Sequence, residues 1–180
     1  MTEKHLYLDF DGVLHPNFVG KGQLFSHMPK LTKAVEGKPL CIAISSSWRF
    51  HENFDYLKSL FPPVIRSQVV GCTGPAHIGK WPRWNEIKRH ATAHGVTDWI
   101  ALDDAFMEFP PECKELILCD GRTGLQDHQI QQLVHWIKNW TYVNNTGLTY
   151  AQMSPTPVGT DGFLLWALAE DDDMRSWINV

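Results

Sequence analysis

Five short, mostly apolar runs recur along this chain, and they constrain the fold more than any other feature of the sequence. The runs are His5–Leu8, Leu40–Ile44, Val69–Cys72, Trp99–Leu102 and Leu116–Cys119. Their length suits β-strands, and their apolar character is continuous rather than alternating. Strands with this pattern are usually covered on both faces, as they are in parallel sheets. The sequence therefore predicts a parallel sheet that is buried between two other layers.

Helical patterns separate these runs. Apolar residues spaced as on one face of a helix predict helices over Met28–Glu36, Phe54–Phe61, Trp84–Ala91 and Ile130–Ile137. Asp127 stands where the last of these helices would have its N-cap residue. The alternation of strands and helices predicts an α/β fold, a three-layer, Rossmann-like doubly wound parallel sheet with right-handed crossovers.

The length of 180 residues suits one domain. Residues 1–140 carry the alternating pattern and are predicted to form the main domain. From residue 141 the sequence changes character, with Pro155, Pro157 and then the acidic run Glu170–Asp173. We expect residues 141–180 to be a C-terminal extension that packs on the core of the main domain.

Acidic and hydroxyl residues gather where three of the predicted strands end. Asp9 and Asp11 follow the first strand, serines 45–47 follow the second, and Asp103 and Asp104 follow the fourth. In such sheets, ligands bind beyond the carboxyl ends of the strands. Taken singly, each group has a structural alternative, because Asp-Gly is a common turn pair and an acidic pair can cap a helix. Their shared position at three strand ends favours a functional site.

A site with four carboxylates needs a cation, because like charges at short range repel one another strongly. The candidate ligands at these strand ends are oxygen atoms, with no His or Cys among them. Oxygen-only ligation favours Mg²⁺ over zinc. We therefore expect Asp9, Asp11, Asp103 and Asp104 to bind Mg²⁺.

Charge, cysteine content and hydropathy bear on partners and compartment. The net charge of −4 gives no general reason to expect nucleic acid as a partner, although a local basic groove is compatible with it. The four cysteines show no C-x-x-C spacing, which favours free thiols in a reducing cytoplasm over disulfides. Met1–Lys4 leads directly into the first strand without a signal-peptide pattern, and the longest apolar run, Phe163–Ala169, is far too short to span a membrane. We expect a cytoplasmic protein without a membrane partner.

Three stretches of the sequence carry a family resemblance. LYLDFDGVLHP contains the first acidic pair, CIAISSSW the serines, and WIALDD the second acidic pair. They resemble the first, second and fourth motifs of the haloacid dehalogenase-like (HAD) superfamily of phosphohydrolases, over about residues 5–140. The third motif of that superfamily is a lone basic residue at the head of a helix. Lys80 in GKWPRWNEI matches it, with Arg83 as the alternative.

A finer resemblance is carried by three shorter stretches. LHP after the first motif, SSSWR, and R-x-x-E-I (Arg83, Glu86 and Ile87) look like a branch of small capless HAD domains, some of which are associated with RNA repair.

The resemblance implies catalytic roles for the acidic residues. Asp9 would be the nucleophile that forms an aspartyl-phosphate. Asp11 would protonate the leaving oxygen and then take a proton from the hydrolytic water. Mg²⁺ would be bound by Asp9, by the backbone carbonyl of Asp11 and by Asp104, with Asp103 as the partner of Asp104. An acid at position 11 also favours phosphoryl transfer, because the dehalogenases of this superfamily lack it.

The remaining roles concern the phosphate group. The resemblance implies that Ser45, or else Ser46, donates to the phosphoryl oxygens and that Lys80 bridges the phosphate and the nucleophile. Arg49 and Arg83 are candidate substrate-binding residues. Arg49 would bind a second phosphate, or else would cap a helix at the surface.

One basic stretch leaves two interpretations open. GKWPRWNEIKRH interleaves Lys80, Arg83, Lys88 and Arg89 with Trp81 and Trp84. Proteins that bind single-stranded nucleic acid combine cations and aromatic side chains in this way. The alternative is that Trp84 faces the core while Lys88 and Arg89 are simply solvated.

Together these features predict a Mg²⁺-dependent phosphomonoesterase, with a catalytically quiet HAD-like binding or regulatory module as the alternative. Many members of the superfamily carry an inserted cap domain, but residues 12–39 and 46–79 leave no room for one. We therefore expect an open site with a rim built from Pro16–Ser26 and Cys72–Pro82. Without a lid, a small substrate gains little binding energy away from its phosphate. An extended phosphomonoester is favoured, with a nucleic-acid end ahead of a phosphoprotein.

Overall fold

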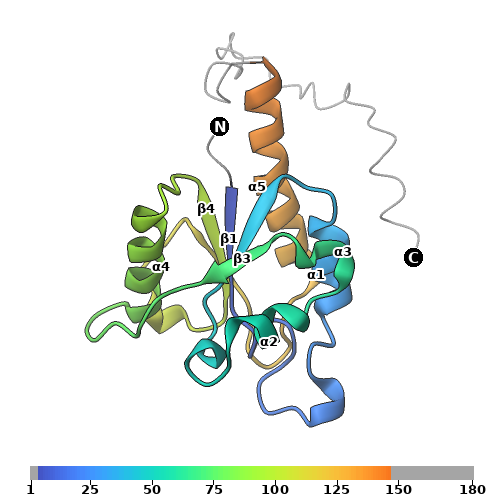
Figure 1. Cartoon of the computed structure of the whole chain (residues 1–180). Helices are drawn as coiled ribbons and strands as arrows, with labels where there is room; N and C mark the ends of the chain where they lie inside the picture. Colours follow the sequence, from blue (N-terminus) through green and yellow to red (C-terminus); the bar gives the residue numbers. More distant parts are fainter. Residues whose placement is uncertain (1–3, 147–180) are drawn as a thin grey trace, which may run out of the picture. The chain divides into compact units, whose positions relative to one another are not determined.

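Five parallel strands form a single sheet in residues 4–146, which are the residues described by the computed structural model (Figure 1). The strands are β1 (Lys4–Leu8), β2 (Leu40–Ile44), β3 (Val69–Cys72), β4 (Trp99–Asp103) and β5 (Leu116–Leu118). Their order in the sheet is β3-β2-β1-β4-β5, and each neighbouring pair is parallel. Each predicted strand is therefore confirmed, with its ends placed to within one residue.

Helices lie between the strands. They are α1 (Met28–Val35), α2 (Phe54–Ser59), α3 (Pro63–Arg66), α4 (Pro82–Ala93) and α5 (Asp127–Thr146), with 3₁₀ turns η1 (Lys21–Gln23), η2 (Ser47–Phe50) and η3 (Phe106–Glu108). The local sequence explains where several of them begin. Proline occupies the first or second position of α1, α3 and α4, where its missing N–H is not needed. At α2, the side chain of Asn53 accepts a hydrogen bond from the N–H of Tyr56 at 2.9 Å.

Helices cover both faces of the sheet, which confirms the three-layer α/β prediction. Along β1, Leu6 and Leu8 belong to the core on one face, whereas Tyr7 belongs to the core on the other. The first face packs against α1, α2, α3 and α5, with Leu133 of α5 fully buried. The second face packs against α4 through residues such as Ile87. Figure 1 shows α4 on one side of the sheet and α1, α3 and α5 on the other.

Strand register brings the carboxyl ends of the three central strands level with one another. Leu8 of β1 pairs with Ile44 of β2 on one side and with Leu102 of β4 on the other. The residues that follow these three in sequence are Asp9, Ser45 and Asp103. The N–H of Asp9 continues the ladder by donating to the carbonyl of Leu102 at 3.0 Å. The sheet thus places three of the predicted site residues side by side at its carboxyl edge.

The connections between the strands hold no folded insertion. Residues 12–39 contain η1 and α1, and residues 46–79 contain η2, α2, α3 and β3. Both segments lie entirely in the described part of the chain, so the structure agrees with the expectation of a capless domain.

The C-terminal prediction falls mostly outside the described residues. The predicted boundary at residue 140 lies within α5, which runs to Thr146. Residues 147–180, and with them most of the predicted extension, are not described. In residues 4–146 we find no helix long and apolar enough to cross a membrane. The four cysteines are free, as the sequence predicts.

Candidate active site

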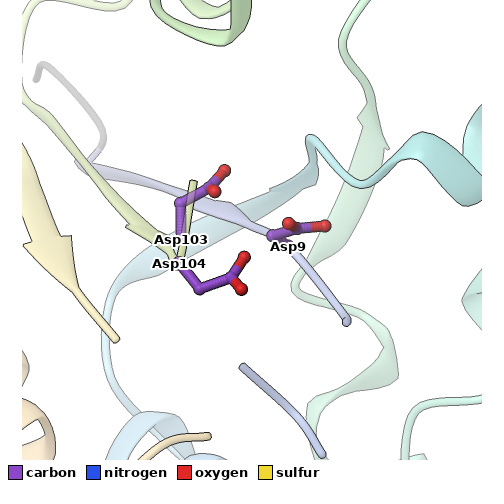
Figure 2. Close-up of side chains that lie close together, drawn as sticks. All are labelled: Asp9, Asp103 and Asp104. Atoms are coloured by element: carbon purple, nitrogen blue, oxygen red, sulfur yellow. The ribbon is translucent and has the colours of Figure 1, made fainter. Parts of the chain in front are cut away.

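Three carboxylates converge at the carboxyl edge of the sheet (Figure 2). Asp9 follows β1, Asp103 is the last residue of β4, and Asp104 is the next residue along the chain. One oxygen of each carboxylate lies within 4.8 Å of the others. The structure thus brings together three of the four acids that the sequence predicts to bind metal, from two strands that are neighbours in the sheet.

Asp9 is almost completely buried. Its Oδ1 accepts a hydrogen bond from the N–H of Phe10 at 2.8 Å, and Nη1 of Arg83 lies 3.7 Å from the same oxygen. Burial raises the pKa of the Asp9 carboxyl, while the charge of Arg83 and hydrogen bonds from Phe10 and Ser46 oppose that rise. Asp9 therefore needs additional positive charge nearby if it is to act as an ionised nucleophile.

Asp103 is fully buried and only partly hydrogen-bonded. Its Oδ1 accepts a hydrogen bond from the N–H of Ala105 at 2.9 Å. Its Oδ2 has no hydrogen-bond partner and lies 3.7 Å from Nε of Arg83. Burial, followed by repulsion from Asp9, raises the pKa of Asp103 to about 8, against the opposing charge of Arg83. A buried oxygen without a partner is costly unless something else binds it.

Asp104 is held by its loop neighbours. Its Oδ2 accepts a hydrogen bond from Nδ2 of Asn17 at 2.8 Å, and the N–H of Asn17 donates to the carbonyl of Gly121 at 2.7 Å. A Cβ atom on Gly12 or on Gly121 would overlap with Oδ2 of Asp104. Gly12 also has a φ of +69°, a conformation that side chains rarely adopt. The two glycines let the backbone pass close to this carboxylate.

This arrangement fits a hard divalent cation. The cluster offers one oxygen from each of three carboxylates. One of the three, Asp103, has an Oδ2 atom without a hydrogen-bond partner. Mg²⁺ prefers oxygen ligands, and a bound cation would offset the burial that raises the pKa of Asp9 and Asp103. Asp9, Asp103 and Asp104 are therefore the side chains that would hold Mg²⁺. Ligation by the backbone carbonyl of Asp11 remains a prediction.

The side chain of Asp11 lies outside this cluster and is clamped by two donors. Its Oδ2 accepts a hydrogen bond from Nε1 of Trp48 at 2.7 Å, and its Oδ1 lies 3.1 Å from Nε2 of His15. Nδ1 of His15 accepts the N–H of Phe25 at 3.3 Å, so in a neutral imidazole the proton sits on Nε2 and is donated to Asp11. Trp48 itself packs edge-on against Phe10. The rotamer of Asp11 is thus set by the protein.

The two serines of the second motif differ in their hydrogen bonds. Oγ of Ser46 accepts the N–H of Trp48 at 3.4 Å, and the same side chain is hydrogen-bonded to Asp9. Ser45 is fully buried, and its Oγ has no hydrogen-bond partner. An unpartnered hydroxyl next to Asp9 is consistent with the predicted donation from Ser45 to a phosphoryl oxygen. That role itself remains a prediction.

Arg83, and not Lys80, is the basic residue that lies beside the carboxylates, so the geometry favours the alternative assignment of the third motif. Lys80 is exposed in the loop before α4. Arg83 is buried in the first turn of α4, between Asp9 and Asp103, and also donates to the carbonyl of Ser45. The physical reason is the start of the helix, because Pro82 begins α4 and leaves Lys80 outside it.

We expect Arg83→Met to lower kcat/KM for a phosphomonoester by about 10²–10³-fold, the usual cost of removing one preorganised group that stabilises developing charge. Arg83→Lys should recover part of this loss, because it keeps the charge but not the planar fork. Lys80→Met is the matched control and should stay close to the wild-type rate. An equal loss in the Lys80 and Arg83 variants would contradict the assignment.

Arg49 is buried and engaged by protein groups, which disfavours its predicted role in binding a second phosphate; that role remains a prediction. Its side chain is 3% exposed and forms an ion pair with Glu86, whose side chain is 6% exposed. The guanidinium also donates to the carbonyls of Ser45, Ser46 and Gly74. These contacts use four of its five N–H groups, so Arg49 braces the loops after β2 and β3.

Two hydrogen bonds of the site, from Asn17 to Asp104 and from Trp48 to Asp11, were not predicted from the sequence. Asn17 is 87 residues from Asp104, and no motif marks it. The sequence around Trp48 does not indicate its hydrogen bond to Asp11, because a tryptophan next to a strand end is usually a residue of the core or of a pocket wall. The LHP and SSSWR stretches that contain His15 and Trp48 were the available signal, since both follow strand ends at the same edge of the sheet.

Comparison with known proteins agrees with this geometry. A family model described as the HAD domain in Swiss Army Knife RNA repair proteins matches residues 5–130, well over half of the chain. The matched range contains β2 to β5, all of β1 except Lys4, and the first turn of α5. No curated protein and no solved structure matches the chain.

Proposed function

The chain belongs to the family of HAD domains in Swiss Army Knife RNA repair proteins, and from this premise we propose that it is a Mg²⁺-dependent phosphomonoesterase acting on a phosphorylated nucleic-acid end. The family implies a phosphohydrolase-type function. The observation that carries the proposal is the position of Asp9, a buried carboxylate in contact range of Arg83 and of two further acids.

In the first step, a carboxylate oxygen of Asp9 attacks phosphorus and the bond between phosphorus and the ester oxygen breaks. Asp11 enters this step in its protonated form and gives its proton to the leaving oxygen, so the products of this step are an alcohol and an aspartyl-phosphate. In the second step, water attacks phosphorus and gives a proton to Asp11. The bond between phosphorus and Asp9 breaks, and inorganic phosphate is released with both acids restored.

The other residues stabilise charge during both steps. Arg83 faces Asp9 and Asp103 and would draw the phosphoryl oxygens toward the nucleophile. Ser45 has a free hydroxyl at the same level of the sheet for donation to phosphate. When bound, Mg²⁺ would neutralise the carboxylates and the phosphoryl oxygens, which lets an anionic nucleophile approach an anionic substrate.

The open rim of the site supports a nucleic-acid end as the substrate. Large apolar side chains are exposed in the loops after β1, β3 and β4, among them Phe18, Ile78 and Met107. Fifteen of the sixteen Lys and Arg residues, but only fourteen of the twenty Asp and Glu residues, lie in residues 4–146. The described domain is therefore not acidic, although the whole chain is, and a polyanion is not excluded by charge.

The test of the proposal is a comparison of substrates. We expect kcat/KM to be higher for a 5′- or 3′-phosphorylated oligonucleotide than for a mononucleotide or a sugar phosphate, because the open site favours substrates that extend along the rim. p-Nitrophenyl phosphate reports the chemistry independently of the substrate body. A kcat/KM that is much higher for a sugar phosphate than for the oligonucleotide would contradict the nucleic-acid assignment. The absence of turnover for every phosphomonoester would favour the catalytically quiet binding module.

A further inference from the structure

A groove runs along the outer side of α4, away from the three carboxylates. It has a volume of about 480 Å³. Its lining residues are His77, Asn85, Lys88, Arg89, Thr92 and Ala93. None of these described lining residues is acidic, and Lys88 and Arg89 are both exposed. We call this feature the α4 groove.

The α4 groove is held in shape by contacts between α4 and the loop that precedes it. Arg89 donates to the carbonyl of Pro75, and the N–H of His77 donates to Oε1 of Glu86 at 2.9 Å. Glu86 is buried and is held in turn by Arg49. The loop is therefore tied to the helix at two points, so this wall of the α4 groove exists before any ligand binds.

The same helix connects the α4 groove to the candidate active site. Arg83, in the first turn of α4, lies against Asp9. Thr92 at the far end of the α4 groove is nine residues further along, which is about 13 Å at the rise of an α-helix. Successive helical residues point about 100° apart, so Arg83 and the groove residues Lys88 and Thr92 lie on opposite faces of α4. A chain with its terminal phosphate at Asp9 would enter the α4 groove by passing around the N-terminus of this helix.

An aromatic residue precedes the first residue of α4, at the N-terminus of the helix. Trp81 is 36% exposed and has a φ of 53°, a left-handed conformation that is unfavourable for a bulky residue. Asn85 supports this conformation by donating to the carbonyls of Lys80 and Trp81 at 2.8 and 3.1 Å. The indole ring of Trp81 packs edge-to-face with that of Trp84, with the ring centroids 6.3 Å apart. A strained backbone conformation that exposes the ring of Trp81 near the candidate active site favours a binding role for this residue over a purely solvent-exposed position.

We propose that the α4 groove holds the sugar-phosphate chain of a single-stranded nucleic acid whose terminal phosphate lies at Asp9, and that Trp81 stacks on one of its bases. The inference rests on the proposed function and adds to it the path of the substrate. Cations that track a backbone next to an aromatic platform are the combination that binds single strands without reading their sequence. A phosphopeptide has no bases to stack and gains nothing from Trp81 beyond apolar contact.

The test compares Trp81→Ala, Trp81→Phe and Lys88→Ala with the control Lys38→Ala/Lys114→Ala, which changes two exposed lysines in the loops before β2 and β5. The first readout is the Kd of a fluorescent, phosphorylated single-stranded oligonucleotide, measured with Mg²⁺ in an Asp9→Asn background so that turnover does not interfere. The second is kcat/KM for the same oligonucleotide and for p-nitrophenyl phosphate.

We expect Trp81→Ala to weaken oligonucleotide binding and kcat/KM by about tenfold or more, the cost of losing one stacked base. Trp81→Phe should restore most of the affinity. Lys88→Ala should reduce the slope of log Kd against log salt by about one. The control variant should bind as wild type does and keep its kcat/KM for p-nitrophenyl phosphate. In Trp81→Ala, kcat/KM should fall more for the oligonucleotide than for p-nitrophenyl phosphate.

The outcomes separate this inference from the proposed function. Oligonucleotide binding that is unchanged in both Trp81→Ala and Lys88→Ala overturns the groove inference, even if phosphatase activity is present. So does a phosphopeptide whose kcat/KM falls in these variants while that of the oligonucleotide does not. An inactive wild-type protein that binds the oligonucleotide through Trp81 and Lys88 supports the groove inference and contradicts the phosphatase.

Discussion

Asp9→Asn is expected to abolish phosphatase turnover, with a fall in kcat on the order of 10⁵-fold or more, as for the loss of other enzyme nucleophiles. An amide oxygen is a far weaker nucleophile than a carboxylate oxygen, so the substitution removes the attacking group while Arg83, 3.7 Å from Asp9 Oδ1 in the wild type, is retained. The measurement is kcat for p-nitrophenyl phosphate at saturating Mg²⁺.

The fold should survive this substitution. Asp9 is buried and burial raises its pKa, so replacing the carboxylate by a neutral amide of similar shape removes a buried charge. We expect a Tm equal to or above that of the wild type in the absence of Mg²⁺. Asp55→Asn, at an exposed position in the first turn of α2, is the control and should leave kcat unchanged. An Asp9→Asn protein that keeps the wild-type rate would end the nucleophile assignment.

Removal of the metal is expected to have an effect of similar size. Two of the three clustered carboxylates are buried, and without a cation burial raises the pKa of both Asp9 and Asp103, the latter to about 8. Either protonation state then opposes the reaction, because a protonated Asp9 is not a nucleophile and an ionised carboxylate without a cation repels a phosphate dianion. We expect no turnover in EDTA and full recovery on addition of Mg²⁺.

Thermal unfolding gives a readout of the same site that does not depend on activity. A ligand that binds only the folded state stabilises it by about 2.7 kcal/mol at a concentration 100 times its Kd. Mg²⁺ should therefore raise the Tm of the wild type, and this rise should be lost in Asp104→Asn. Full activity in a demetallated sample, or an equal rise of Tm in the variant, would contradict the metal assignment.

The sheet and the convergence of the acids could be predicted because both depend on short-range sequence features. Continuous apolar runs marked the strands, and parallel strands in register bring the residues after Leu8, Ile44 and Leu102 to one edge. Once the strands are known, Asp9 and Asp103 need no further information to become neighbours.

The identity of the basic residue could not be settled in the same way. Successive residues of a helix point about 100° apart, so the direction of a side chain near the N-terminus depends on the residue at which the helix begins. Trp81 takes a left-handed conformation and Pro82 starts α4, which turns Arg83 toward Asp9. Proline at a first helical position was the available signal, and it favoured Arg83 over Lys80.

The contacts of Arg49 and Asn17 depend on the folded chain as a whole. Arg49 pairs with Glu86, which is 37 residues away, and Asn17 donates to Asp104 across the ends of two strands. Neither partner lies in the same motif. A basic residue after a serine cluster is compatible with binding phosphate or with bracing a loop, and only the burial of both charges identifies the brace.

The most direct test of the account is whether Asp9 becomes phosphorylated during turnover. Wild-type protein, Mg²⁺ and a phosphomonoester would be mixed rapidly, quenched in acid at a series of times and examined by mass spectrometry of the intact protein and its peptides. We expect one phosphoryl group on the peptide that contains Asp9, which forms before steady state, is removed by hydroxylamine and is missing in Asp9→Asn. Wild-type turnover with no phosphorylated protein at any time, or with the phosphoryl group on another residue, would contradict the account.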